Sequence, residues 1–186
     1  MKNPARQFSL LFLLATMASG CATLNKEECI QANWSSIGYQ DGSQGESKAR
    51  LSEHVKACRK HGITPDATLY QRGYKNGIKI FCRADNGYQQ GIDKEQYQGI
   101  CPSSLQTAFL AQYIKGLKVA LEGLDIKYDQ VTSDLDYAKL KRARLKEGKS
   151  PKKIDQEIDY LQSNQTDILR ERERLNRWIA RWSGKL

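Results

Sequence analysis

The sequence predicts a mainly α-helical protein, in which a small disulfide-tied domain rich in glycine and tyrosine precedes a long antiparallel helical hairpin of the coiled-coil type. Three observations predict this fold class. Apolar residues recur at intervals of three and four in the second half of the chain, all five cysteines lie before residue 102, and aromatic residues alternate with glycines among those cysteines. Intervals of three and four place apolar side chains in one stripe along a helix. We expect a leader over residues 1–20, the small domain over 21–102 and the hairpin over 103–186.

The leader has the three parts of a bacterial signal peptide: a positively charged start, a short apolar run and small residues at the exit. The apolar run is shorter than the roughly 20 residues that span a bilayer. Ala18-Ser19-Gly20-Cys21 reads as a lipobox, so we expect cleavage before Cys21 and acyl chains, palmitate among them, on this cysteine. Several acyl chains anchor a protein firmly, and Ala22 rather than Asp at the next position favours sorting to the outer membrane. We expect the protein to face the periplasm there. The alternative is an ordinary cleaved signal with Cys21 as a free thiol.

Five cysteines are an odd number, and lipidation of Cys21 leaves an even set in an oxidising compartment. That set is Cys29, Cys58, Cys82 and Cys101, which allows three pairings. We expect Cys29–Cys58, because both should lie on adjacent antiparallel helices. We expect Cys82–Cys101, because it ties back the Gly/Tyr loop between them. The alternative is a zinc site that includes His54 and His61; the wide spacing and the lack of Cys-x-x-Cys disfavour it. We therefore expect no metal and no cofactor.

Local signals predict short helices in the small domain. Asn25 is followed three residues later by Glu28, which is the capping-box pattern of a helix start. A short helical face over residues 51–58 ends at Gly62, and Thr64-Pro65-Asp66 begins the next helix. These signals place several short helices before Pro102.

An aromatic–glycine rhythm runs through the same domain, as in "WSSIGYQDG", "YQRGYKNG" and "GYQQG". A glycine inside a helix costs up to about 1 kcal/mol relative to alanine, so a close contact should offset it. One interpretation is tight packing of short helices, with a neighbouring backbone or ring in each glycine notch. The other is a groove for sugar rings, lined by Trp34, Tyr39, Tyr74, Tyr88 and Tyr97.

After Pro102 the composition changes to long helical patterning without cysteine. The first stripe is Leu117, Leu121, Leu124, Tyr128, Val131, Leu135, Ala138 and Leu145, and the second is Ile154, Ile158, Leu161, Ile168, Leu175, Ile179 and Trp182. Between them, Gly148-Lys149-Ser150-Pro151 combines a helix stop with a helix start. The sequence therefore predicts two antiparallel arms over residues 117–182. Three polar residues at seam positions, Arg142, Gln165 and Arg172, should fix their register.

The predicted turn is the most basic part of the chain. The candidate contact residues are Lys146, Lys149, Lys152 and Lys153. Such a cluster favours contact with an anionic lipid surface, peptidoglycan or an acidic envelope protein. The alternative is a solvated turn without a partner. Nucleic acid is not expected, because a lipidated envelope protein does not meet it.

The blocks "EECIQANWSSIGYQDGSQG", "HVKACRKHGITPD", "YQRGYKNGIKIFC", "NGYQQG", "YQGICP" and "FLAQYIKG" resemble a proteobacterial lipoprotein family known only as domain of unknown function 2799. The resemblance covers residues 21–120. Asn33 stands where an Asp is usual, and Asp93 or Lys94 where a glycine is usual. The resemblance implies a short envelope lipoprotein with these four cysteines, and it carries no activity, cofactor or catalytic residue.

No motif for a hydrolase, a zinc protease, a phosphate-binding loop or a dinucleotide-binding fold occurs in the chain. Asp41 and His54 could form an acid–base pair if their helices pack antiparallel; the alternative is a structural hydrogen bond between them. The sequence thus favours a non-enzymatic structural or interaction lipoprotein of the bacterial envelope, held to the membrane by its N-terminal lipid. The alternative is a glycan-binding or glycan-cleaving module that uses the aromatic groove.

Overall fold

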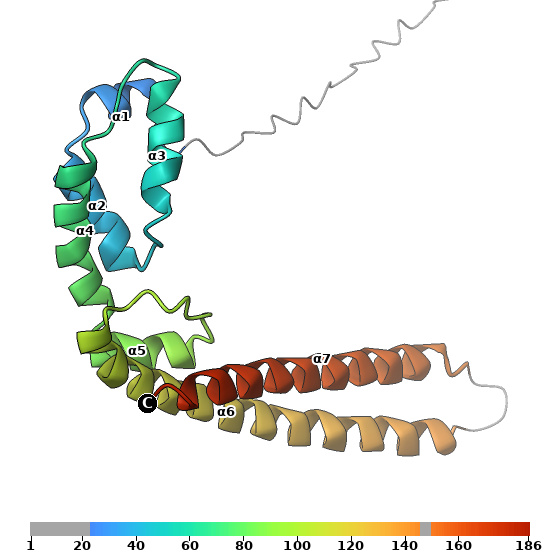
Figure 1. The fold of residues 1–186 in the computed structure, drawn as a ribbon. Helices are drawn as coiled ribbons and strands as arrows, with labels where there is room; N and C mark the ends of the chain where they lie inside the picture. Colours follow the sequence, from blue (N-terminus) through green and yellow to red (C-terminus); the bar gives the residue numbers. More distant parts are fainter. Residues whose placement is uncertain (1–22, 146–149) are drawn as a thin grey trace, which may run out of the picture.

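The computed structural model describes residues 23–145 and 150–186, which form seven α-helices and no β-strand. The predicted fold class is confirmed (Figure 1). The helices are α1 (Lys26–Ile30), α2 (Trp34–Gln44), α3 (Arg50–Arg59), α4 (Ala67–Phe81), α5 (Ala84–Ile92), α6 (Ser103–Ala143) and α7 (Lys152–Ser183). None of the described helices is long and apolar enough to cross a membrane.

The expected helix starts of the small domain are present. Asn25 accepts a hydrogen bond from the Glu28 backbone, and the Glu28 carboxylate accepts one from the Asn25 backbone, so the capping box is complete. Asp66 caps α4 by accepting from Leu69 N at 2.9 Å. Each bond satisfies a backbone N–H that has no partner within the helix.

Glycine faces hold the small domain together. Helices α2 and α4 run parallel, and the backbone of each enters the glycine face of the other: Gly38 and Gly42 meet α4, whereas Gly73 and Gly77 meet α2. Helices α5 and α6 repeat the arrangement, with Gly87 and Gly91 on one side and Gly116 on the other. The tight-packing interpretation of the aromatic–glycine rhythm is therefore correct. The glycines cost helix propensity, and close backbone approach offsets that cost.

Both predicted disulfides are confirmed. Cys29–Cys58 joins α1 to the end of α3 with a Cα–Cα distance of 5.5 Å, and Cys82–Cys101 joins the end of α4 to the segment before α6 at 5.6 Å. All four cysteines are buried. No group of His, Cys, Asp or Glu side chains that could hold a metal occurs in residues 23–145 and 150–186.

Helices α6 and α7 form the predicted antiparallel hairpin and lie side by side (Figure 1). Its seam buries eight of the expected residues: Leu117, Leu124, Val131, Leu135, Ala138, Ile168, Leu175 and Trp182. The three polar seam residues each find a partner on the other arm. Arg142 pairs with Asp155 at 2.6 Å, Arg172 with Asp125 at 2.7 Å, and Gln165 donates to Thr132 at 2.8 Å. These cross-links agree on one register, as predicted.

The base of the hairpin is joined to the small domain. Helix α6 begins directly after Pro102, and its first part packs against α5 before it continues into the hairpin. At the other end of the chain, the Trp182 ring packs against Tyr97 in a tilted arrangement, with centroids 4.8 Å apart. Because α6 is one uninterrupted helix, the hairpin arm is a direct extension of the domain.

Candidate functional site

Asp41 and His54 meet in the core of the small domain. His54 Nε2 lies 2.8 Å from Asp41 Oδ2, and the Tyr70 hydroxyl donates to the same oxygen at 2.7 Å. The other ring nitrogen of His54 lies 2.9 Å from Thr23 Oγ1. Asp41 and His54 are only 7% and 3% exposed. The Trp34 and Tyr70 rings lie against the imidazole.

This cluster has the character of a structural network. Every polar group in it has a partner, as buried polar groups require, and burial raises the pKa of Tyr70 above its ordinary value. Asp41 and His54 are both buried, and the Trp34 and Tyr70 rings lie near the imidazole, so the pair presents little surface to a substrate. The bond from Thr23 also fixes the chain to the core only two residues after Cys21.

The five aromatic residues of the predicted sugar groove do not share one exposed strip. Trp34, Tyr74 and Tyr97 are buried in the core. Tyr39 is 46% exposed on α2, and Tyr88 is half-buried on α5 beneath the Lys115 ammonium. The physical reason is the glycine faces, which draw the helices together and place most rings between them.

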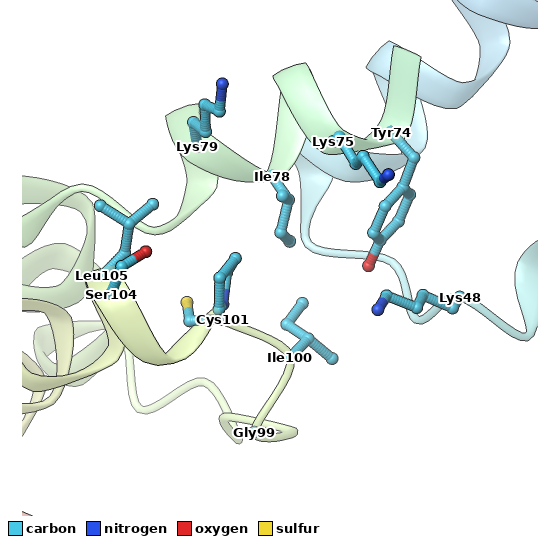
Figure 2. Close-up of a pocket in the computed structure, with 11 residues that line it drawn as sticks. Lys48, Tyr74, Lys75, Ile78, Lys79, Gly99, Ile100, Cys101, Ser104 and Leu105 are labelled. Carbon is cyan, nitrogen blue, oxygen red and sulfur yellow. The ribbon is translucent and has the colours of Figure 1, made fainter. Parts of the chain in front are cut away.

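An open hollow of about 760 Å³ lies between α4, the start of α6 and the connection from α2 to α3. Figure 2 shows Ile78 and Ile100 on opposite sides of the hollow, with Lys48, Tyr74 and Lys75 at one end. Ser104 and Leu105 lie at the other end. Its lining also contains Lys79, Gly99, Cys101 and Pro102, and no acidic residue. The hollow is therefore apolar in its middle and cationic at its rim.

The wall formed by residues 95–101 is held in place from several sides. The Tyr97 hydroxyl accepts from Cys101 N at 2.9 Å, and the Tyr113 hydroxyl donates to the Glu95 carbonyl at 2.7 Å. Gly99 has a φ of +75°, which favours glycine, and packs close to Trp182. With Cys101 in a disulfide, this wall needs little ordering when a ligand arrives.

A second hollow of about 220 Å³ adjoins the first and shares three lining residues with it, Lys48, Tyr74 and Lys75. The Tyr74 hydroxyl donates to the Glu46 carbonyl at 2.7 Å and so fixes the connection that carries Lys48. Among residues 23–145 and 150–186, the ammonium groups of Lys48, Lys75 and Lys79 form no ion pair. These cations remain available to an anion from outside.

The sequence gives only a partial signal for this hollow. Lys75 and Lys79 stand one helical turn apart with Ile78 between them, a local signal for one basic and apolar edge. Nothing in the sequence links that edge to Lys48 or Ile100, because the connections that bring them together depend on the packed helices.

The basic tip is the turn of the hairpin with the four predicted contact lysines, and the structure describes only two of them. Lys146 and Lys149 lie outside the described residues, as does Cys21. Lys152 and Lys153 begin α7 and are exposed. Just below them, Lys141 lies 3.7 Å from Glu157 and joins the two arms.

Residues 33–118 match the family described as "Protein of unknown function (DUF2799)". The matched range covers α2 to the first part of α6, and so contains the glycine-packed helix pairs and the hollow beside α4. No curated protein and no solved structure matches the chain.

Proposed function

Residues 33–118 of this chain belong to the DUF2799 family, and on that premise we propose that the protein is a non-enzymatic lipoprotein of the bacterial envelope. Its small domain sits at the membrane, on the periplasmic side of the outer membrane. Its hairpin extends from that domain and contacts an anionic partner with its basic tip. The observation that carries this proposal is the continuity of α6, which belongs to the domain and to the hairpin at once.

The N-terminal attachment supports the membrane part of the proposal. Thr23 is bonded to His54 in the core, so the domain is fixed to the chain two residues after Cys21. Two residues of chain span at most about 7 Å. If Cys21 carries the lipid, the domain has no long tether and must lie against the head groups.

The length of α6 supports the role of the hairpin as a rigid arm. Its 41 residues correspond to about 60 Å at a rise of about 1.5 Å per residue. The ion pairs of Arg142 and Arg172 and the Gln165 hydrogen bond fix the second arm along its length. An arm of this kind holds its tip at a set distance from the domain.

The far end of the hairpin carries features of a contact surface besides its charge. Tyr137 and Tyr160 are 69% and 68% exposed. Tyr137 stands one helical turn before Lys141, and Tyr160 stands one turn after Glu157, and these two charged residues pair across the arms. Because the arms run antiparallel, both tyrosines lie about one helical turn from that ion pair, on the side away from the tip. An exposed tyrosine can pack its ring on a partner while its hydroxyl stays in water.

The test is binding of the purified protein to anionic vesicles, to peptidoglycan sacculi and to neutral vesicles at low and high salt. Replacing Lys146, Lys149, Lys152 and Lys153 with Gln should weaken binding to the anionic target and leave the helical circular dichroism unchanged. The matched control replaces four exposed lysines elsewhere, Lys26, Lys56, Lys60 and Lys118, with Gln. Binding should also fall with salt, because charges more than about 8 Å apart are largely screened at physiological ionic strength.

Three kinds of result test the tip, the identity of its partner and the lipid anchor. Equal losses in the tip variant and the control variant would mean that net charge alone binds, and the tip would not be a contact surface. Binding to sacculi and not to vesicles would identify the glycan layer as the partner, and the reverse would identify lipid. Mass spectrometry of the mature N-terminus tests the anchor, and an unmodified N-terminus at another residue would refute it.

A further inference from the structure

The hollow beside α4 differs from the tip in both shape and chemistry. It is concave, has a volume of about 760 Å³ and combines an apolar middle with a cationic rim. Ligand sites in proteins are typically concave, roughly 300–1,000 Å³ in volume, and mostly apolar with a few polar groups that fix orientation. The observed combination selects a ligand that is itself apolar along its length and negatively charged at one end.

We propose that this hollow binds a single acyl chain that ends in a carboxylate or a phosphate. The anionic head lies between Lys48 and Lys75, beside Tyr74. The chain extends along Ile78 and Ile100 toward Leu105, in the direction that Figure 2 shows. This site is separate from the basic tip, so it does not depend on the proposed function.

Charge complementarity argues for the anionic head. Three lysines line the hollow and no acidic side chain does. As for most lysines of residues 23–145 and 150–186, no carboxylate of the described chain lies within ion-pair distance of Lys48, Lys75 or Lys79, so none competes with an incoming anion. Lys48 and Lys75 also line the adjoining smaller hollow, so they form the junction of the two spaces. An anion at that junction meets both ammonium groups.

The apolar walls argue for the acyl chain. Ile78 is buried, whereas Ile100 and Leu105 are half-buried and face the hollow. An acyl chain that covers the exposed parts of Ile100 and Leu105 removes apolar surface from water, which is favourable by about 25 cal/mol per Å² of buried apolar area. A compact ion such as free phosphate buries no apolar surface in the hollow, so its binding lacks this favourable contribution.

The site is also ordered before a ligand binds. The Cys82–Cys101 disulfide, the Tyr97 and Tyr113 hydrogen bonds and the Tyr74–Glu46 bond hold its walls. A preformed site loses less entropy on binding than a flexible one.

The experiment is calorimetric titration of the purified protein, both disulfides intact, with four probes below their micelle-forming concentrations. Dodecyl phosphate and dodecanoate carry the chain with an anionic head, dodecyltrimethylammonium carries the same chain with a cationic head, and inorganic phosphate has no chain. We expect both anionic amphiphiles to bind at one site. The cationic amphiphile and phosphate should bind at least about tenfold more weakly, since three lysines surround the hollow.

The Lys48→Gln/Lys75→Gln variant should weaken dodecyl phosphate binding by about tenfold, because two favourable charge contacts are lost. The matched control, Lys56→Gln/Lys60→Gln, removes the same charge from exposed positions outside the hollow and should bind as the parent does. The tip variant should also bind as the parent does, which separates this proposal from the proposed function.

Two outcomes overturn the proposal. One is equally tight binding of the cationic amphiphile, which would leave only a general affinity for apolar chains. The other is unchanged dodecyl phosphate affinity in the Lys48→Gln/Lys75→Gln variant, with the helical circular dichroism of the parent. If that variant loses its fold, Ile100→Ser replaces it: weakened binding of both anionic amphiphiles supports the site, and unchanged binding refutes it. A preference for dodecanoate over dodecyl phosphate, or the reverse, identifies the head group.

Discussion

Replacing Gly42 by alanine tests whether the glycine faces hold the small domain together. A Cβ at this position would lie 2.5 Å from the Tyr74 carbonyl oxygen and 2.8 Å from Ile78 N, both backbone atoms of α4. Ordinary contact begins at 3.4 Å, so α2 and α4 would have to separate by about 0.9 Å, the difference between 2.5 and 3.4 Å. Overpacking of this kind costs about 1–3 kcal/mol or more, and the better helix propensity of alanine returns up to about 1 kcal/mol.

We therefore expect Gly42→Ala to lower the free energy of unfolding by about 2 kcal/mol, which is about 4–8 °C in Tm for a chain of this size. The assay is urea and thermal unfolding with both disulfides intact. Gly123→Ala is the matched control, because Gly123 also lies inside a helix, and a Cβ at that position would have nothing within 4 Å. That variant should gain about 0.5–1 kcal/mol. Similar changes in both variants, in either direction, would refute the reasoning.

Two further predictions concern the core. Replacing Cys29 and Cys58 with serines removes a disulfide between residues 29 positions apart, and it should lower the free energy of unfolding in urea by about 3 kcal/mol. Peptide mapping of the unreduced parent should show the Cys29–Cys58 linkage. A Cys58–Cys82 peptide would contradict it. Burial raises the pKa of Tyr70, Tyr97 and Tyr113 above the usual 10.0, so the folded state keeps protons that the unfolded chain releases above about pH 10. Stability should be fully present below that pH and should fall as the pH rises further; an unfolding free energy unchanged from about pH 9 to about pH 12 would contradict this.

The residues that match the family correspond to a defined structural unit, the two glycine-faced helix pairs. Residues 33–118 contain both parallel pairs, α2 with α4 and α5 with α6. Parallel neighbours require a return segment between them, and α3 and the loop after α5 provide it. The two disulfides tie the ends of these return segments to the helices. The same small set of features thus explains the glycines, the cysteines and the tyrosines of the domain.

Local patterns determined much of this protein. The capping box at Asn25, the start of α4 at Asp66 and the apolar stripes of the hairpin depend only on residues a few positions apart, and all three are present. The disulfide pairing followed from the order of the helices. Asp41 and His54 do meet, and they do so through the structural contact that the sequence interpretation gave as the alternative to an acid–base pair. The register of the hairpin followed because polar residues in an apolar seam must find partners.

Only the tertiary structure decided which faces meet. The sequence shows that glycine recurs beside tyrosine, and it leaves open whether the rings point outward to a ligand or inward to the core. Close backbone contact between parallel helices turns Trp34, Tyr74 and Tyr97 inward, and all three are buried. The hollow beside α4 is undetermined by sequence for the same reason, since Lys48, Lys75 and Ile100 approach one another only after the helices have packed. A repeating pattern records the neighbours of a residue along one helix, whereas a site depends on the shapes of several elements at once.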